Sequence, residues 1–274
     1  MKLAIGLLLS HGFPAPTEFW SSFHKLQERL RGGGANAQLP EAQRITALSV
    51  ITSTAFPVDV SRNTIVRDVL AHDFDYLFFA DCDEVFPEDC VERLLAHDVP
   101  VVTARYHMRK EPYHAVAYVK HRVLTGPHCY APVHYGQGLI EIERGGAGAL
   151  LIRRDVLETI RDRIGENWFR YQRSPDPPYD LSVSEDFWFY QQAREAGFQT
   201  YCDWDVEVEH LQTFGINRSW NLSYLDANVR ELGRLSPDAR QTALDSLIVC
   251  GYPDGLTLAS GDVVPAYQIT PGER

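Results

Sequence analysis

The sequence predicts an α/β protein with a parallel sheet covered by helices on both faces. Its 274 residues, 45% of them hydrophobic, can bury the core of one large domain, or of one domain with a smaller appendage. Over the first hundred residues short apolar runs alternate with amphipathic stretches, a pattern typical of strands joined by crossover helices. The second half breaks this regular alternation.

The first half contains alternating strand and helix signals in a regular order. Apolar runs predict strands at residues 3–9, 45–52, 76–80 and 99–104. Apolar periodicity predicts helices at residues 17–31, ended by Gly32, and at residues 60–71. A third helix is expected from Pro87, which suits a first helical turn and is followed by Glu88 and Asp89. Ligands of such sheets bind outside the carboxyl ends of the strands.

The second half is expected to add shorter elements. Strands are predicted at residues 149–152, 199–202 and 206–211, and helices at residues 153–160 and 187–196. Ser184 suits the N-cap of the second of these helices, and Gly197 suits its end. Beyond residue 212 two more helices are expected, the second running from Ser236 to about residue 249.

The composition disfavours several protein classes. The opening apolar run is short and lacks a small-residue cleavage site, so it reads as a strand rather than a signal peptide. No segment has the roughly 20 apolar residues that cross a bilayer. The five cysteines are odd in number and have no C-x-x-C spacing, which argues against a disulfide framework and a thiolate metal site. We therefore expect no membrane span and a reducing, cytoplasmic location.

The charge is unevenly distributed along the chain. The formal net charge of -11 argues against a broad nucleic-acid surface, because Lys and Arg supply affinity for phosphates. Residues 101–144 differ, with six Lys and Arg against three acidic residues, and with five histidines and five tyrosines. This stretch is either a mixed surface loop or a basic, aromatic platform for an anionic or ring-shaped ligand.

Three carboxylates follow the strand expected at residues 76–80. Asp81, Asp83 and Glu84 repel one another unless a positive group lies between them. An oxygen-ligated divalent cation that also binds a phosphate would fit, and so would acids that cap the next helix. The helix expected from Pro87 begins too late for Asp81 to cap it. A lone D-x-D is a weak motif, so both interpretations stay open at this point.

Two other segments are rich in small or acidic residues. Gly145-Gly146-Ala147-Gly148 precedes a strand, where small residues let the backbone approach a ligand, although a tight turn is the commoner explanation. Ser184-Glu185-Asp186 opens a helix, where acids in the first turn are favourable in any case.

Taken in order, these motifs resemble those of the metal-dependent nucleotide-sugar glycosyltransferases of GT-A fold. The matching segments are D-C-D after a strand, G-G-A-G-A-L-L-I-R-R, S-E-D-F-W-F-Y-Q-Q-A-R-E-A-G and a strand ending in V-E-H. V-S-R-N-T-I-V and R-K-E-P-Y-H-A-V-A-Y are similar to segments of small, family 2-like enzymes of bacteria and their phages. The resemblance covers about residues 2–211, and the order of several motifs makes it more specific than any one of them.

The resemblance implies a mixed, mainly parallel sheet flanked by helices, and a division of the chain. Residues 1–212 would form the glycosyltransferase domain, with a nucleotide-binding half at 1–104 and a donor-sugar and acceptor half at 105–212. Residues 213–274 would form a C-terminal helical extension. That extension would either pack on the core, the favoured alternative, or act as a lid with Trp220 or Tyr224 over the sugar. A phage-encoded protein would work in the host cytoplasm.

The resemblance also implies roles for individual residues. Asp81, Asp83 and His210 would bind the metal, and Asp186 would be the general base, with Glu185 beside it or sharing that role. The donor nucleotide and sugar would contact Asp81, Arg62, Ser10, Gly145, Gly146, Ala147 and Gly148. The acceptor would contact Arg109, Tyr113 and Tyr118. The usual P-T-x-N after the first strand is replaced by Leu9-Ser10-His11-Gly12, so the base-binding contacts, and with them the nucleotide, are not specified.

The expected reaction is transfer of a sugar from a nucleoside-diphosphate sugar, with UDP as the first nucleotide to test. A cation at the diphosphate stabilises the leaving group as its negative charge develops. A histidine ligand favours Mn²⁺ over Mg²⁺. A carboxylate base predicts inversion at the anomeric carbon. The acceptor would be a carbohydrate, a lipid-linked sugar, a protein, or a hydroxymethylated base in DNA. The alternatives are a nucleotidyltransferase and a non-catalytic nucleotide-sugar-binding module.

Overall fold

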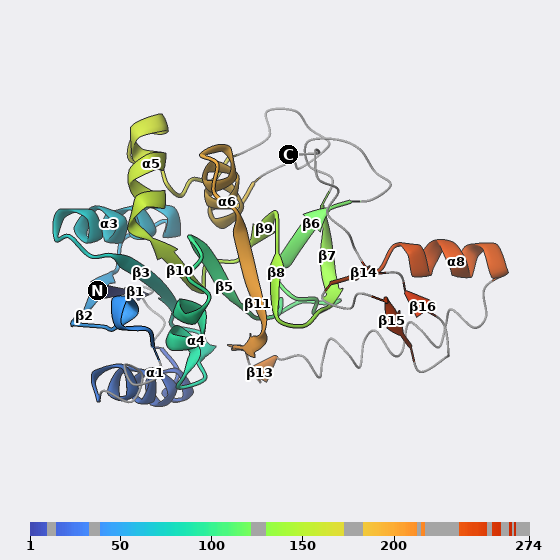
Figure 1. Cartoon of the computed structure of the whole chain (residues 1–274), viewed down its shortest axis with the longest axis horizontal. Helices are drawn as coiled ribbons and strands as arrows, with labels where there is room; N and C mark the ends of the chain where they lie inside the picture. The colour runs from blue at the N-terminus through green and yellow to red at the C-terminus, as the bar shows by residue number, and fades with distance from the viewer. Residues whose placement is uncertain are drawn as a thin grey trace.

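The structure is a computed structural model of the whole chain. It describes residues 1–9, 15–32, 39–121, 130–172, 183–212, 215–216, 236–250, 254–258, 263–264 and 266. Its centre is a seven-stranded sheet with the order β2-β1-β3-β10-β5-β11-β8 (Figure 1). These strands are β1 (Lys2–Leu8), β2 (Ala47–Ser53), β3 (Tyr76–Asp81), β5 (Val101–Arg105), β8 (Leu139–Glu141), β10 (Ala149–Arg153) and β11 (Thr200–Glu207).

The sheet is mixed and mainly parallel. Strand β1 pairs in parallel with β2 and β3, and β11 pairs in parallel with β5. Strand β10 runs antiparallel between β3 and β5, and β8 is antiparallel to β11 at the edge. Strands β1, β2, β3, β5 and β11 therefore share one direction. The predicted α/β fold with a mixed, mainly parallel sheet flanked by helices is confirmed.

Helices cover both faces of this sheet (Figure 1). One face carries α1 (Thr17–Arg31) and α4 (Cys90–Ala96), and the other carries α3 (Val58–Ala71), α5 (Arg154–Ile164) and α6 (Glu185–Glu195). Alternate residues of each strand enter the two core layers, as strand geometry requires. In β3, for example, Leu77 and Phe79 pack beneath α3, whereas Phe78 and Ala80 pack beneath α1 and α4.

Several predicted element boundaries are wrong. The helix expected from Pro87 begins at Cys90, because the strand β4 (Glu84–Val85) and a turn occupy the preceding residues. The two strands expected at residues 199–202 and 206–211 are instead a long β11, irregular between Asp203 and Glu207, and a short β12 (Glu209–Leu211). β12 pairs with β4 and with β13 (Gly215–Ile216) in a small separate sheet.

The basic stretch of residues 101–144 contributes strands rather than one loop. β6 (Ala117–Lys120) and β7 (Tyr130–Tyr135) pair antiparallel, β9 (Arg144–Gly145) joins β6, and β14 (Ile248–Val249) adds in parallel to β7. Two of its cations face acids: Arg105 pairs with Glu207, and Arg109 pairs with Asp83. The interpretation of this stretch as a mixed surface loop is therefore wrong for its strand-forming part.

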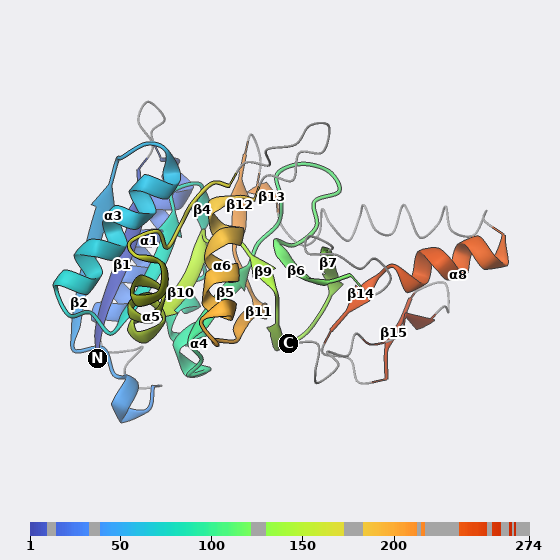
Figure 2. The same cartoon turned by 90° about the horizontal axis from the view of Figure 1, so that it is seen from above.

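Part of the C-terminal tail lies beside the four-stranded sheet with the order β14-β7-β6-β9 (Figure 2). Helix α8 (Pro237–Asp245) begins as predicted after Ser236, whose hydroxyl accepts from the Ala239 amide, but it ends before β14 rather than near residue 249. β15 (Leu256–Thr257) and β16 (Val263–Val264) form a short hairpin. The earlier expected helix, with Trp220 and Tyr224, lies outside the described residues. Within the described ranges, no helix is long and apolar enough to cross a bilayer.

Candidate active site

The D-x-D segment lies at the carboxyl end of β3, where ligands of α/β sheets bind. Asp81 is the last residue of β3, and its amide donates to the Gly148 carbonyl at 2.9 Å. Asp83 lies in the turn that follows, and Glu84 begins β4. The carboxylates therefore sit between a buried strand and a short strand, not in the first turn of a helix. This placement disfavours the helix-capping interpretation.

His210 is brought to this turn by backbone pairing. It lies opposite Glu84 in the β12–β4 pair, and the next amide, of Leu211, donates to the Asp83 carbonyl at 2.7 Å. Its Nε2 lies 3.6 Å from Oδ2 of Asp83. Its Nδ1 donates to the His107 carbonyl at 2.8 Å, which orients the ring so that Nε2 faces Asp83.

Asp83 also contacts Arg109, whose guanidinium lies 2.9 Å from Oδ2. Burial of this carboxyl opposes its ionisation, but hydrogen bonding to His210 and the charges of His210 and Arg109 hold its pKa below the usual value. Asp83 is therefore a carboxylate at neutral pH. Arg109, which is predicted to contact the acceptor, faces the D-x-D turn.

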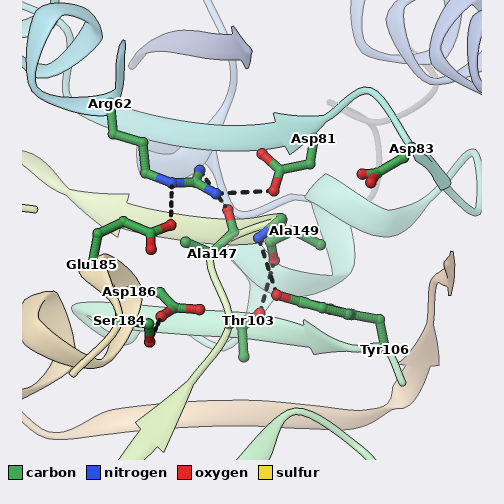
Figure 3. Close-up of polar contacts among 12 residues, drawn as sticks. Arg62, Asp81, Asp83, Thr103, Tyr106, Ala147, Ala149, Ser184, Glu185 and Asp186 are labelled. Atoms are coloured by element: carbon green, nitrogen blue, oxygen red, sulfur yellow. Dashed lines mark hydrogen bonds and ion pairs between the residues drawn. The ribbon is translucent and has the colours of Figure 1, made fainter. Parts of the chain in front are cut away.

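Arg62 is buried behind Asp81, as Figure 3 shows. Its guanidinium donates to Oδ2 of Asp81 at 2.9 Å and to the Ala147 carbonyl at 3.1 Å, and its Nε lies 3.5 Å from Oε1 of Glu185. The side chain also packs over the ring of Phe79, 5.1 Å from the centroid. The predicted neighbourhood of Arg62 and Asp81 is present, and the buried guanidinium points into the protein toward three separate elements.

Two buried oxygens near this turn fit a cation. Oδ1 of Asp81 and Oε2 of Glu84 lack a hydrogen-bond partner in the described part of the chain. Burial raises the pKa of both carboxyl groups, and the charge of Asp83 adds to this effect. Such orphaned carboxyl oxygens are the donors that hard divalent cations bind. However, among the described residues no three His, Cys, Asp or Glu side chains surround one point, so Asp83 and His210 come together without Asp81.

The glycine-rich segment is packed tightly against other parts of the site. A Cβ atom at Gly146 would overlap the Tyr106 hydroxyl, and one at Gly148 would overlap the Glu84 carboxyl group. Tyr190 donates to the Gly146 carbonyl at 3.2 Å. Gly145, Gly146, Ala147 and Gly148 are all buried. Close packing of side chains onto the backbone accounts for the absence of side chains at these glycines.

The two acids of S-E-D occupy different surroundings at the start of α6. Ser184 is the N-cap residue of α6, as predicted, but its hydroxyl donates to Oδ1 of Asp186 rather than accepting from a helix amide. The Phe187 amide donates to the same oxygen at 2.8 Å. Burial, helped by the charge of Glu185, raises the pKa of Asp186 to about 7. Glu185 itself faces Arg62 and accepts a hydrogen bond from Tyr171. Asp186 therefore has the pKa expected of a base that works near neutral pH.

A cavity of about 570 Å³ opens beside the D-x-D turn. It is lined by Leu8, Leu9, Thr54, Ala55, Phe56, Val58, Ser61, Asp81, Cys82, Asp83 and Arg109. The cavity is therefore bounded by the segments that follow β1, β2 and β3. Phe56 is 88% exposed at its edge. No role is predicted for Phe56, although F-P shortly after a predicted strand is a recognisable turn signal. Ser10, predicted to contact the nucleotide, lies outside the described residues.

Of the predicted acceptor residues, Tyr118 has an electrostatic interaction with Asp186. Its ring packs against Phe187, with 5.1 Å between centroids, and against His114, with 5.4 Å. Burial raises the pKa of Tyr118, and the negative charge of Asp186 adds to this rise, so the two side chains are within electrostatic reach. Tyr113 lies in the preceding connection with a positive φ of 55°. The predicted trio is therefore dispersed between the D-x-D turn and the α6 side.

Comparisons with known proteins add little to this geometry. No known family profile matches the chain, and no curated protein sequence is similar to it at a significant level. Among the solved structures that match is the crystal structure of A197 from STIV, with 17% identity over 77% of this chain and 86% of that chain, and a TM-score of 0.43. The function of the chain must therefore be argued from its own residues.

Proposed function

We propose that the protein is a glycosyltransferase that moves a sugar from a nucleoside-diphosphate sugar to an acceptor hydroxyl. The observation that carries this proposal is that Asp83, paired with His210, lines a 570 Å³ cavity, while Asp186 is connected to the same turn through Arg62 and Glu185. Cavities of this size hold small-molecule ligands. The D-x-D and S-E-D motifs thus meet at one end of one sheet.

The donor nucleotide would occupy the cavity at the ends of β1, β2 and β3. Phe56 offers an exposed ring on which a base stacks, and stacking of this kind contributes roughly 1–3 kcal/mol per base. UDP remains the first nucleotide to test. The donor diphosphate would then lie toward Asp81, Asp83 and Arg109, which line the same cavity.

A divalent cation would be held by Asp83 and His210, whose Oδ2 and Nε2 atoms lie 3.6 Å apart. The mixed oxygen and imidazole set favours Mn²⁺, with Mg²⁺ the second candidate. When bound, the cation supplies charge stabilisation for the departing diphosphate. Arg109 offers a second positive charge at the same carboxylate.

Asp186 would act as the general base. As the bond between the anomeric carbon and the diphosphate oxygen breaks, its electron pair leaves with the diphosphate. The acceptor oxygen bonds to the anomeric carbon, and its proton passes to Asp186. A carboxyl with a pKa of about 7 holds that proton well enough to assist and is ionised often enough to start the next cycle. Direct attack of this kind inverts the anomeric configuration.

The acceptor would approach between α6 and the β6–β7 sheet, where Tyr118 lies near Asp186. An aromatic surface suits a sugar ring or an unstacked base. A carbohydrate is the first acceptor class to test, and a hydroxymethylated base is the second. The basic residues counted in the sequence do little for nucleic acid here, because Arg105 and Arg109 are paired with acids.

The test is a donor screen with purified protein. UDP-, GDP-, CMP- and dTDP-sugars are incubated with Mn²⁺ or with chelator, and free nucleotide is measured. Metal-dependent release from one donor, lost in Asp83→Ala and His210→Ala and kept in the surface control Glu88→Ala, supports the proposal. Binding of a donor without release under any condition would replace it with a non-catalytic binding module. No binding of any donor would overturn it altogether.

A further inference from the structure

Arg62 joins three elements that meet at the candidate site. It projects from α3 and contacts Asp81 at the end of β3, the Ala147 carbonyl before β10, and Glu185 at the start of α6 (Figure 3). The Arg62 side chain is only 3% exposed, and that of Glu185 is 9% exposed. Buried charges of this kind are stable only when they are paired. The charges of Arg62, Asp81 and Glu185 therefore depend on one another.

The neighbouring acids Glu185 and Asp186 have different contacts. Glu185 forms an ion pair with the Arg62 guanidinium and accepts a hydrogen bond from the Tyr171 hydroxyl. Both described hydrogen bonds of Asp186, from Ser184 and from the Phe187 amide, end on Oδ1. Oδ2 of Asp186 therefore remains the oxygen that can receive a proton.

We propose that Arg62 and Glu185 are positioning residues that act through Asp186. Arg62 holds the Glu185 carboxyl group in place through their ion pair, and Glu185 in turn makes Asp186 the carboxyl group that accepts the acceptor proton on Oδ2. The role in the reaction rests on the proposed function, but the effect on Asp186 does not. Glu185 then does not accept the acceptor proton itself, either together with Asp186 or in its place.

The charged and titratable groups around Asp186 are consistent with this division. Burial raises the pKa of Asp186 and the charge of Glu185 raises it further, whereas the hydrogen bonds from Ser184 and Phe187 and the charge of Arg62 lower it. Four tyrosines also sense the charge of Asp186, namely Tyr106, Tyr118, Tyr171 and Tyr190. Burial raises the pKa of each, so they remain neutral while Asp186 titrates. Glu185 thus adds to the effect of burial in raising the pKa of Asp186.

The first test needs no substrate. The carboxyl carbon of Asp186 is followed by ¹³C NMR from pH 4 to 9 in the presence of chelator, with its signal assigned from Asp186→Asn. In Glu185→Gln we expect the pKa of Asp186 to fall by about one unit, because a neighbouring negative charge is removed. Glu195→Gln, at the other end of α6, is the matched control and should not move it. An unchanged pKa in Glu185→Gln overturns the proposal.

A second variant, Arg62→Lys, tests the proposal if Glu185→Gln does not fold. Arg62→Lys keeps the charge but lacks the guanidinium fork that reaches Asp81, Ala147 and Glu185 together. We expect it to change the pKa of Asp186 by more than 0.5 unit, and no change counts against the proposal. Once a donor is known, the acid limb of the pH–rate profile of Glu185→Gln should move to lower pH by the NMR shift, with a lower plateau, because a base of lower pKa accepts the acceptor proton less well. Loss of turnover at every pH, with the NMR shift present, would make Glu185 a catalytic residue.

If no donor is ever turned over, the NMR shift still decides whether Glu185 controls Asp186. The proposed function and the proposed positioning role therefore fail independently.

Discussion

His210 and Asp83 lie side by side although they come from opposite halves of the chain, with Nε2 of His210 3.6 Å from Oδ2 of Asp83. Backbone pairing builds this contact: His210 lies opposite Glu84, and the Leu211 amide donates to the Asp83 carbonyl. Since the backbone sets the position, either side chain can be replaced without moving the other. The pair can therefore be dissected one residue at a time.

Replacement of either member should weaken metal binding. We expect His210→Ala and Asp83→Asn each to lower the affinity for Mn²⁺ by at least about tenfold, because each removes a ligand from a small set. Isothermal titration calorimetry with Mn²⁺ alone measures this. His97→Ala is the control, since His97 belongs to a separate ion pair with Asp203. Equal Mn²⁺ affinity in all three variants would show that the cation binds elsewhere.

The raised pKa of Asp186 has a consequence for stability. Because the pKa rises from 3.8 to about 7 on folding, the folded state binds more protons than the unfolded chain between these values. The free energy of unfolding therefore falls as the pH rises through this range. Asn does not ionise, so Asp186→Asn does not lose stability in this way. The variant should therefore have a higher free energy of unfolding than the wild type at pH 8, by roughly 1–3 kcal/mol.

Urea unfolding of both proteins at pH 4.5 and pH 8 tests the Asp186 prediction. The difference between them should be large at pH 8 and small at pH 4.5. A difference that is the same at both values would mean that Asp186 is ionised throughout in the folded protein.

Phe56 should affect nucleotide affinity and little else. Its side chain is 88% exposed, so Phe56→Ala removes few packing contacts. If a base stacks on the ring, the affinity for the free nucleotide should fall by roughly 5- to 100-fold. Fluorescence or calorimetric titration with UDP measures the change, and Trp20→Ala, an exposed aromatic residue on α1, is the control. Nucleotide affinity that is untouched by Phe56→Ala would place the base elsewhere in the cavity.

Gly148 is expected to tolerate no side chain while Glu84 is present. A methyl group at this position overlaps the buried Glu84 carboxyl group, so Gly148→Ala should destabilise the fold by roughly 1–3 kcal/mol. Glu84→Ala opens the space, and the double variant should recover most of the loss. Chemical denaturation of the four proteins gives the interaction energy. Strict additivity would indicate that the segment around Gly148 moves to make room.

The spacing of apolar residues, together with Gly and Pro at the ends of elements, is sufficient to predict most of the sheet and its helices. Helix α1 occupies the expected residues because Pro16 precedes it and Gly32 follows it. The error at Pro87 arose because a local rule for helix starts does not know that Glu84 and Val85 pair with β12, about 120 residues later in the chain. Long-range strand pairing of this kind leaves no trace in the local pattern.

The site was predicted unevenly for a similar reason. Motif order named Asp83, His210, Arg62 and Asp186, but it could not show that Arg62 points away from solvent toward Glu185. The glycine segment was expected to make room for a ligand, whereas in the fold it makes room for Tyr106 and Glu84. Phe56 was missed because an exposed aromatic residue in a turn has no periodic signature. Side-chain direction is decided by tertiary packing, which a single sequence does not reveal.

The position of the antiparallel strand β10 affects how the chain folds during synthesis. β10 fills the space between β3 and β5, both of which precede it in the sequence. During synthesis, a nascent chain that ends before residue 149 has an uncovered edge on β3, and such edges pair with other chains. The sheet can close only after residues 149–153 have left the ribosome. Ribosome pausing shortly before this point, or a premature stop there, should therefore give aggregation-prone fragments rather than a folded amino-terminal half.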